Sequence, residues 1–350
     1  MDSRMQGATR IESPSRSAGP SRSEESDRIE GATRIAVVGC GAWGRNHVRT
    51  LSEMGHLYAV ADEHGQRSFD MAAEFGVVPL APGQAFEDER VDGVVLALPA
   101  ELHAPMAEEA LRAGKHVLVE KPIALSAGAG ALAVAAAEET GRVLMVGHVL
   151  RHHPAYRALE ELVAAGELGE LRYVQSHRLG MGRFHASFDA AWDLAPHDLS
   201  LVLALAGEAP VEAAGRGGAI AAPDMLDTAL IHLRFPSGLA GHVMVSRHSP
   251  YRERRLTAVG TRGMAVVDDL EDWPRKLALY RHALRENGRG GLDFDLSEPE
   301  HVPVEPAQAL TEELRNFVAA IEGREAPRTP GEGGVEVVRV LETALGAAAR

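Results

Sequence analysis

Short apolar runs alternate with helix-like segments between residues 34 and 147, and this alternation constrains the fold more than any other feature. The run at residues 34–39, RIAVVG, is short and β-branched, as in a strand that is buried on both faces. Similar runs, separated by segments with helical spacing, lie at 57–62, 91–99, 115–120 and 142–148. Because the connections are short, this pattern predicts right-handed crossovers and a parallel, doubly wound sheet.

The rhythm changes after Gly147. A helix is expected over 153–169, a strand with one wet face over 170–180, and an apolar helix over 197–207. Strand-like runs without intervening helices follow at 211–220, 228–235, 239–248, 255–260 and 263–269. Consecutive strands without crossover helices predict a largely antiparallel open sheet. Two helical segments, at 308–323 and 334–349, are expected at the end of the chain.

The length of 350 residues is enough for two ordinary domains. We expect an α/β domain over 34–150 and an α+β domain, which binds substrate and makes oligomer contacts, over 151–350. The first 33 residues are rich in Ser, Arg, Glu and Gly and nearly free of large apolar side chains. This composition predicts a disordered tail over 1–33.

Charge and cysteine content exclude several classes of partner. The net charge of −14 argues against nucleic acid, because phosphate binding needs a basic surface. No apolar run is long enough to span a bilayer, so no membrane association is expected. Cys40 is the single cysteine, which permits no internal disulfide and fits a reducing compartment. With no apolar signal core at the N-terminus, a cytoplasmic location is expected.

A glycine-rich loop follows the first predicted strand. The segment GCGAWG (39–44) has G-x-G-x-x-G spacing and stands between a predicted strand and a predicted helix. The first glycine permits a tight turn, the second lets the backbone approach a pyrophosphate, and the third lets helix and strand pack closely. The loop therefore predicts a Rossmann domain that binds a dinucleotide through Gly39, Gly41, Ala42, Trp43 and Gly44.

Asp62 ends the next predicted strand. A carboxylate at this distance from the glycine loop accepts hydrogen bonds from the adenosine ribose hydroxyls. It also repels a 2′-phosphate, so NAD is predicted as the cofactor in preference to NADP. Arg67, five residues further on, weakens this preference.

Lys121 is unusual because the chain uses arginine for almost all of its positively charged side chains. Lysine and arginine together number 36, and only three of them are lysines. Lys121 ends a predicted strand at the carboxyl edge of the sheet, and Pro122 keeps it extended. Lysine can lose its proton when it is partly desolvated, whereas arginine cannot. Lys121 is therefore a candidate proton shuttle, and the alternative is a salt bridge or a solvated strand end.

Asp193, His197 and Asp198 cluster just before and at the start of an apolar helix. Asp193 and His197 are four residues apart and share a face if the turn is helical. His197 can then transfer a proton or hold a substrate hydroxyl, and Asp198 can cap the helix. The alternative is a structural histidine. Neither H-E-x-x-H nor Cys/His spacing occurs, so no metal site is predicted.

The chain resembles the Gfo/Idh/MocA oxidoreductases over nearly everything after residue 33. The matching segments include VVGCGAWGRNH, VEKPIAL, GHVLRHHPAYRALEELVAAGELG and WDLAPHD. The E-K-P segment together with the later P-H-D is quite specific. The WDLAPHD form and RRLTAVGTRGMAVVDD look most like the branch that oxidises UDP-N-acetylglucosamine, or its uronic acid, at C3.

The resemblance implies roles for individual residues. Lys121 and His197 match the catalytic lysine and histidine of the family, and Asp193 matches its substrate-side aspartate. Arg151 is expected to reach an anion of the substrate, and a homo-oligomer, dimer or tetramer, is expected. The residues that match the family's cofactor contacts beyond the glycine loop are Leu98, Pro99, His103, Glu120 and Lys121. Leu98 replaces the commoner threonine, so one hydroxyl contact is absent.

The resulting prediction is an NAD-dependent oxidoreductase that interconverts a secondary alcohol and a ketone on a sugar, with a nucleotide sugar at C3 as the expected substrate. Lys121 removes or returns the hydroxyl proton, and His197 assists. The segments RRLTAVG and SRHSPYRERR either hold a nucleotide diphosphate or form an ordinary charged sheet face. Two other functions share the fold, an NAD-dependent glycosidase and a non-catalytic NAD-linked sensor.

Overall fold

A computed structural model describes residues 32–182, 189–221, 223 and 225–346. The tail predicted over 1–33 lies outside the described residues, apart from its last two. No helix within the described part of the chain is long and apolar enough to cross a membrane.

The first sheet is parallel, as the sequence predicts. Within the described residues it has six strands in the order β3-β2-β1-β4-β5-β6. The strands are β1 (Ile35–Val38), β2 (Leu57–Ala61), β3 (Val78–Leu80), β4 (Gly93–Leu96), β5 (His116–Glu120) and β6 (Leu144–Gly147). The order reverses between β1 and β4, and such a switch point is where open parallel sheets bind ligands. The short edge strand β3 was not predicted, because three residues around Pro79 carry almost no periodicity.

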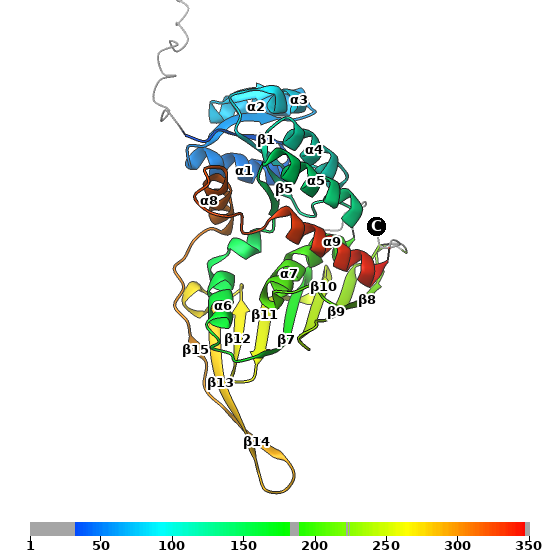
Figure 1. Ribbon diagram of the computed structural model, residues 1–350, viewed down its shortest axis with the longest axis vertical. Helices are drawn as coiled ribbons and strands as arrows, with labels where there is room; N and C mark the ends of the chain where they lie inside the picture. Colours follow the sequence, from blue (N-terminus) through cyan, green and yellow to red (C-terminus); the bar gives the residue numbers. More distant parts are fainter. Residues whose placement is uncertain (1–31, 183–188, 222, 224, 347–350) are drawn as a thin grey trace, which may run out of the picture. The chain divides into compact units, whose positions relative to one another are not determined.

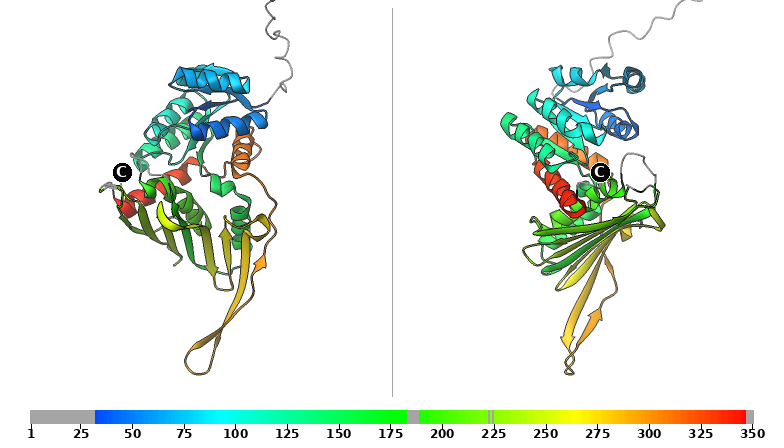
Figure 2. Two further views of the ribbon diagram at one scale, coloured as in Figure 1. Left: turned by 180° about the vertical axis from the view of Figure 1, so that it is seen from behind. Right: turned by 90° about the vertical axis from the view of Figure 1, so that its right-hand side faces the viewer.

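Helices cover both faces of this sheet (Figure 1). Ala36 and Val38 point into the core that includes α4 (Ala100–Arg112) and α5 (Ala127–Thr140). The alternate residues Ile35 and Val37 face α1 (Ala42–Glu53), α2 (Gly65–Phe75) and α8 (Ala309–Ile321). The remaining helix before β4 is α3 (Pro82–Glu87). Helix α8 thus comes from the far end of the chain and lies beside α1 (Figure 2).

The second sheet is largely antiparallel, which confirms the prediction. Its path is β14-β13-β12-β11-β7-β10-β9-β8, and β15 pairs with β13; β7 and β10 form a parallel pair. The strands are β7 (Leu171–Met181), β8 (Glu212–Gly218), β9 (Thr228–Arg234), β10 (Ala240–Ser246), β11 (His248–Gly260), β12 (Gly263–Asp268), β13 (Leu277–Glu286), β14 (Leu292–Leu296) and β15 (Glu300–His301). Strands β13 to β15 were not predicted.

Among the described residues, three helices pack against the second sheet. These are α6 (Pro154–Ala164), α7 (Ala190–Ala206) and α9 (Gly331–Leu345), and the short helix η1 (Val149–His152) connects β6 to α6. A second short helix, η2 (Trp273–Arg275), precedes β13. Helix α9 also packs against α5 and β6. It therefore contacts both the first sheet with its helices and the second sheet.

Candidate active site

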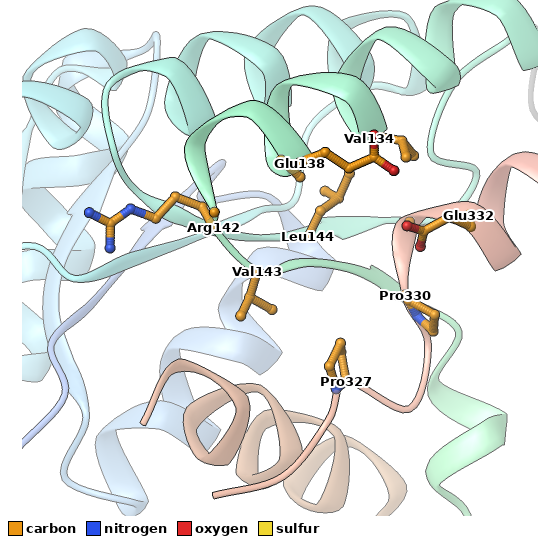
Figure 3. A pocket seen from close by; sticks show the side chains of 11 residues that line it. Val134, Glu138, Arg142, Val143, Leu144, Pro327, Pro330 and Glu332 are labelled. Atoms are coloured by element: carbon orange, nitrogen blue, oxygen red, sulfur yellow. The ribbon is translucent and has the colours of Figure 1, made fainter. Parts of the chain in front are cut away.

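One pocket lies at the amino edge of the parallel sheet, where its strands begin. It has a volume of about 300 Å³ and is lined by Val143 and Leu144, at the start of β6, together with Pro327 and Pro330 (Figure 3). Open parallel sheets bind ligands outside the carboxyl ends of their strands. The candidate active site therefore lies at the opposite edge, where β1, β2, β4, β5 and β6 end.

The glycine loop has the geometry that a dinucleotide requires. Gly39 has φ +103°, and a Cβ there would lie 2.2 Å from the Ala97 carbonyl oxygen. A Cβ on Gly44 would lie 1.8 Å from the Gly39 carbonyl oxygen, so both positions need glycine for close packing. At Gly41 a Cβ would meet none of the described atoms within 4 Å. The space next to Gly41, at the N-terminus of α1, fits a pyrophosphate.

Asp62 is held rigidly beside this loop. Its Oδ2 accepts a 2.8 Å hydrogen bond from the Cys40 backbone N–H, and its Oδ1 accepts one of 2.8 Å from that of His64. The guanidinium of Arg67 lies 4.0 Å from Oδ1. Burial, and then the Asp62 carboxylate, raises the pKa of the Cys40 thiol to about 11. Cys40 is therefore a neutral loop side chain, and the carboxylate is the polar group at this end of β2.

Glu120, at the end of β5, is the centre of a buried hydrogen-bonded group. Its Oε1 lies 2.8 Å from His47 Nε2 and accepts a bond from the Trp43 indole N–H, and its Oε2 accepts one of 3.2 Å from the Lys121 backbone. Burial raises the pKa of Glu120, but the bonds to His47 and Trp43 and the charge of Lys121 outweigh it and leave that pKa below its ordinary value. Glu120 is therefore a carboxylate. The part played by His47 was missed, although its spacing four residues after Trp43 on α1 was a usable signal.

Lys121 reaches across to the second part of the fold. The Lys121–Pro122 peptide bond is cis. The amine Nζ donates to the backbone oxygen of Asp193 at 2.9 Å and to its carboxylate Oδ1 at 3.0 Å. The structure thus brings together the lysine at the end of β5 and the aspartate in the first turn of α7.

His197 lies one turn after Asp193 in the same helix. Helix α7 begins at Ala190, where Asp189 caps it by accepting a 2.8 Å bond from the Trp192 backbone N–H. Burial, followed by the charge of Lys121, lowers the pKa of His197 well below 6.5. Its imidazole is therefore neutral at neutral pH, and its Nδ1 is enclosed with no hydrogen-bond partner among the described residues.

The role suggested for Asp198 as a helix cap is wrong. Because α7 starts eight residues earlier, Asp198 lies within the helix and is 1% exposed. Its Oδ2 accepts a 2.6 Å bond from Arg178 Nε, and its Oδ1 accepts one of 2.6 Å from Ser176 Oγ. This buried pair ties α7 to β7 and so fixes the helix that carries Asp193 and His197.

His103 connects two loops at the carboxyl edge of the sheet. Its ring nitrogens lie 2.7 Å from the Pro122 carbonyl oxygen and 2.8 Å from that of Leu98. Burial lowers the pKa of His103 despite these two carbonyl groups. Leu98 is half-buried and Pro99 is exposed as the N-cap of α4. The structure therefore brings this segment next to the loop of Lys121, and its contact with a cofactor stays a prediction.

Arg151 is not brought to Asp193. It lies on η1, where its Nε donates a 2.8 Å bond to Glu160 Oε1. Arg328 binds the other oxygen of the same carboxylate. The expected contact between Arg151 and a substrate anion stays a prediction, and the structure directs the guanidinium toward an internal partner instead.

A different set of arginines lies beside Asp193. A pocket of about 470 Å³ is lined by Asp193, Leu194, Ser246, Arg247, Arg252 and Arg254. Arg247 forms a buried ion pair with Asp227 at 2.9 Å. Arg254 donates to the backbone oxygens of Leu179 and Glu253, and within the described residues no carboxylate pairs with Arg252 or Arg254. We call this the arginine pocket. In the same described residues, no group of three or more His, Cys, Asp or Glu side chains is placed to hold a metal ion.

The sequence matches a known family in both halves. Residues 33–148 match the oxidoreductase family with an NAD-binding Rossmann fold, and residues 156–266 match the GFO/IDH/MocA C-terminal domain. A UDP-N-acetylglucosamine 3-dehydrogenase from Acidithiobacillus ferrooxidans is 32% identical over 314 residues, which are 89% of this chain and 95% of that protein. The scyllo-inositol 2-dehydrogenase (NAD(+)) from Bacillus subtilis is 28% identical over 310 residues, covering 84% of this chain and 87% of that protein.

Solved structures agree with these matches. The Acidithiobacillus enzyme superposes with a TM-score of 0.78 at 29% identity, covering 91% of this chain and 98% of that one. GenD2 from gentamicin A biosynthesis, solved in complex with NAD, gives a TM-score of 0.76 at 27% identity, covering 93% of this chain and 96% of that one. On these matches, the chain belongs to the Gfo/Idh/MocA family of oxidoreductases and carries its NAD-binding Rossmann domain.

Proposed function

We propose that this oxidoreductase is an NAD-dependent dehydrogenase that interconverts a secondary alcohol and a ketone at C3 of a nucleotide sugar. The contact between Lys121 Nζ and Asp193 is the observation that carries the proposal. It joins the carboxyl edge of the dinucleotide-binding sheet to the helix that lines the arginine pocket. The similarity to a UDP-N-acetylglucosamine 3-dehydrogenase supports the class of substrate.

Residues of the first sheet's edge would hold the cofactor. Gly41 leaves room for the pyrophosphate, the fixed carboxylate of Asp62 would bind the adenosine ribose, and Glu120 would lie near the nicotinamide ribose. Bound NAD would supply the hydride acceptor for the alcohol carbon. The protein's own task is to orient the sugar and move the hydroxyl proton.

Exchanging Asp62 for asparagine is expected to erode the preference for NAD. The change removes the negative charge that repels a 2′-phosphate, with Arg67 only 4.0 Å away to pair with one. A hydrogen bond to a charged group contributes about 1.5–3 kcal/mol, so the Kd for NADH should rise about 10- to 100-fold. Fluorescence titration with NADH and NADPH measures both constants without a sugar substrate. An unchanged ratio of the two Kd values would contradict this role of Asp62.

Lys121 is the group that accepts the proton of the sugar hydroxyl. Asp193 holds the amine in place through two oxygens, and the neutral imidazole of His197 lies one helical turn away on the same face. Lys121 first passes a proton to the neutral His197, and the resulting amine takes the hydroxyl proton as the hydride departs. In the reverse direction the same groups return the proton to the carbonyl oxygen.

The arginine pocket would bind the charged part of the substrate. Guanidinium groups recognise phosphate oxygens through paired hydrogen bonds, and two guanidiniums without a carboxylate partner in the described residues suit a diphosphate. The pocket borders Asp193, so a ligand anchored there would place its sugar toward Lys121. This favours a nucleotide sugar over a neutral sugar.

Replacing Arg254 with alanine should therefore raise KM for the nucleotide sugar about 10- to 100-fold, because one charge-assisted contact is lost. KM for NAD should not change. Arg255 offers a matched control, since it is the next residue of β11, pairs with Asp268 at 2.7 Å and does not line the pocket. Equal effects of R254A and R255A on KM would argue against substrate binding by Arg254.

The function itself is tested with a panel of sugars and nucleotide sugars in the presence of NAD, followed by NADH absorbance. UDP-N-acetylglucosamine and its uronic acid come first. Nitrophenol release from a nitrophenyl glycoside would instead identify an NAD-dependent glycosidase. Tight NADH binding without any hydride exchange across the panel would identify a sensor and refute the proposed dehydrogenase.

A further inference from the structure

A second pocket meets helix α7 away from the arginine pocket. It has a volume of about 390 Å³ and lies between η1, the C-terminal half of α7 and the start of α9. Among its lining residues are His148, Ser200, Ala204, Thr329, Gly333 and Val337. None of its described lining residues is shared with the arginine pocket. We call it the rear pocket.

His148 lines the rear pocket and directly follows strand β6. Its side chain is 3% exposed, and neither ring nitrogen has a hydrogen-bond partner among the described residues. Buried polar groups of folded proteins are almost always paired, so an imidazole with both nitrogens unpaired indicates hydrogen-bond partners such as water. Burial, then the charge of Arg151, lowers the pKa of His148 to about 3, while Glu120 opposes and Lys121 reinforces this shift. The ring is thus neutral and offers one donor and one acceptor.

One face of α7 extends from Asp193, which binds Lys121, to the rear pocket. Asp193, His197, Ser200 and Ala204 follow one another at spacings of four, three and four residues, so they share that face. Asp193 binds the Lys121 amine at one end, and Ser200 and Ala204 line the rear pocket at the other. His197 stands between them, and its enclosed Nδ1 has no partner in the described part of the chain.

Helix η1, which follows His148, packs against α7. The charged and titratable groups that act on His197 are Lys121, Arg178, His148 and Arg254. The charge of Lys121 also acts on His148, where it lowers the pKa of the ring. Two neutral imidazoles in sequence can pass a proton by accepting it on one nitrogen and releasing it from the other.

We propose that His148 relays the hydroxyl proton between His197 and water in the rear pocket. The inference rests on the proposed dehydrogenase function. During oxidation the O–H and C–H bonds of the carbinol break and a carbonyl forms. The cofactor would take the hydride, and the hydroxyl proton passes through Lys121 to His197, to His148 and to water. Ser200, Thr329 and Arg151 supply the polar partners that water in this pocket needs. The proton thus leaves along α7 and does not cross the cofactor site.

The test replaces His148 with alanine and uses the sugar that the panel identifies. The expected results are a fall in kcat of about 10- to 100-fold, a larger solvent isotope effect on kcat, and an unchanged Kd for NADH. Added imidazole should restore part of kcat, because the deleted ring leaves a space that opens on the rear pocket. H148F, which fills that space, should lose activity without rescue.

His152 provides the matched control. It is a neighbouring buried histidine, 2% exposed, on η1, and it does not line the rear pocket. H152A should show neither imidazole rescue nor a changed solvent isotope effect. If H148A has the kcat of the wild type, or if H148A and H152A respond alike to imidazole, the relay is overturned. An enzyme that oxidises the sugar and is inactivated by K121M would then still have the proposed function.

A second measurement needs no substrate. In the ¹⁵N spectrum of histidine-labelled protein, H148A should shift the ring signals of His197, because His148 is one of the groups that act electrostatically on His197. H152A should leave those signals in place. Ring signals of His197 that are unchanged by H148A overturn the relay even if no sugar in the panel is oxidised.

Discussion

Replacing Lys121 with methionine is expected to abolish sugar oxidation and to leave NADH binding intact. Methionine keeps the unbranched chain but has no amine to take the hydroxyl proton, and positioned acid–base groups typically contribute about 10²–10⁴-fold in rate. The glycine loop and Asp62, which would hold the adenosine half of the cofactor, do not contact this amine. Turnover is followed by NADH absorbance, and the Kd for NADH by fluorescence. Wild-type turnover by K121M would refute the assignment.

Lys121→Arg separates proton transfer from simple charge. An arginine retains a cation that can pair with Asp193, but it does not lose its proton in a protein. If Lys121 acts by proton transfer, K121R is as inactive as K121M. Substantial activity in K121R would show that Lys121 acts as a fixed positive charge.

Replacing Asp198 with alanine is expected to cause the largest loss of stability among these variants. Arg178, which is buried, would be left without its carboxylate at 2.6 Å, and Ser176 Oγ would lose its acceptor. Removing one partner of a buried ion pair typically costs about 3–5 kcal/mol, because the other charge stays buried. Urea unfolding of the two proteins measures the difference in the free energy of unfolding.

Glu212→Ala is the control for Asp198→Ala. Glu212 also pairs with an arginine, Arg234, at 3.0 Å, but both side chains are about 60% exposed. Exposed ion pairs contribute about 0–1 kcal/mol, so E212A should change stability little. A loss below about 1 kcal/mol in D198A would contradict the anchoring of α7 by Asp198.

Local pattern was sufficient for the parallel sheet and its loop. Five of the strands are short apolar runs, and each is bounded by segments with helical spacing, so their period and length are visible in the sequence. The glycines at 39 and 44 are required by contacts within a few residues of the same turn or with the adjacent strand end. Edge strand β3 and the polar, exposed β14 carry little apolar periodicity and were missed.

The start of α7 was misplaced for a local reason. Pro196 lies inside the helix, and prolines usually mark the first turn, so the pattern favoured a start near His197. The actual cap is Asp189. The first turn of α7 therefore carries Asp193 together with the buried residues Ala190, Ala191 and Trp192. Because the helix starts earlier, Asp198 is not the cap but a buried partner of Arg178.

By itself, the sequence determined the alternation of strands and helices in the first sheet apart from β3, the glycine loop and the chemistry that Lys121, Asp193 and His197 offer. Tertiary structure alone decided which of these side chains meet. The Lys121 amine and the Asp193 carboxylate are separated by 72 residues, and Glu120 and His47 by 73. Such contacts depend on how β5, α1 and α7 pack together, which no local periodicity encodes. The same packing paired Arg151 with Glu160, and it placed Arg254 beside Asp193.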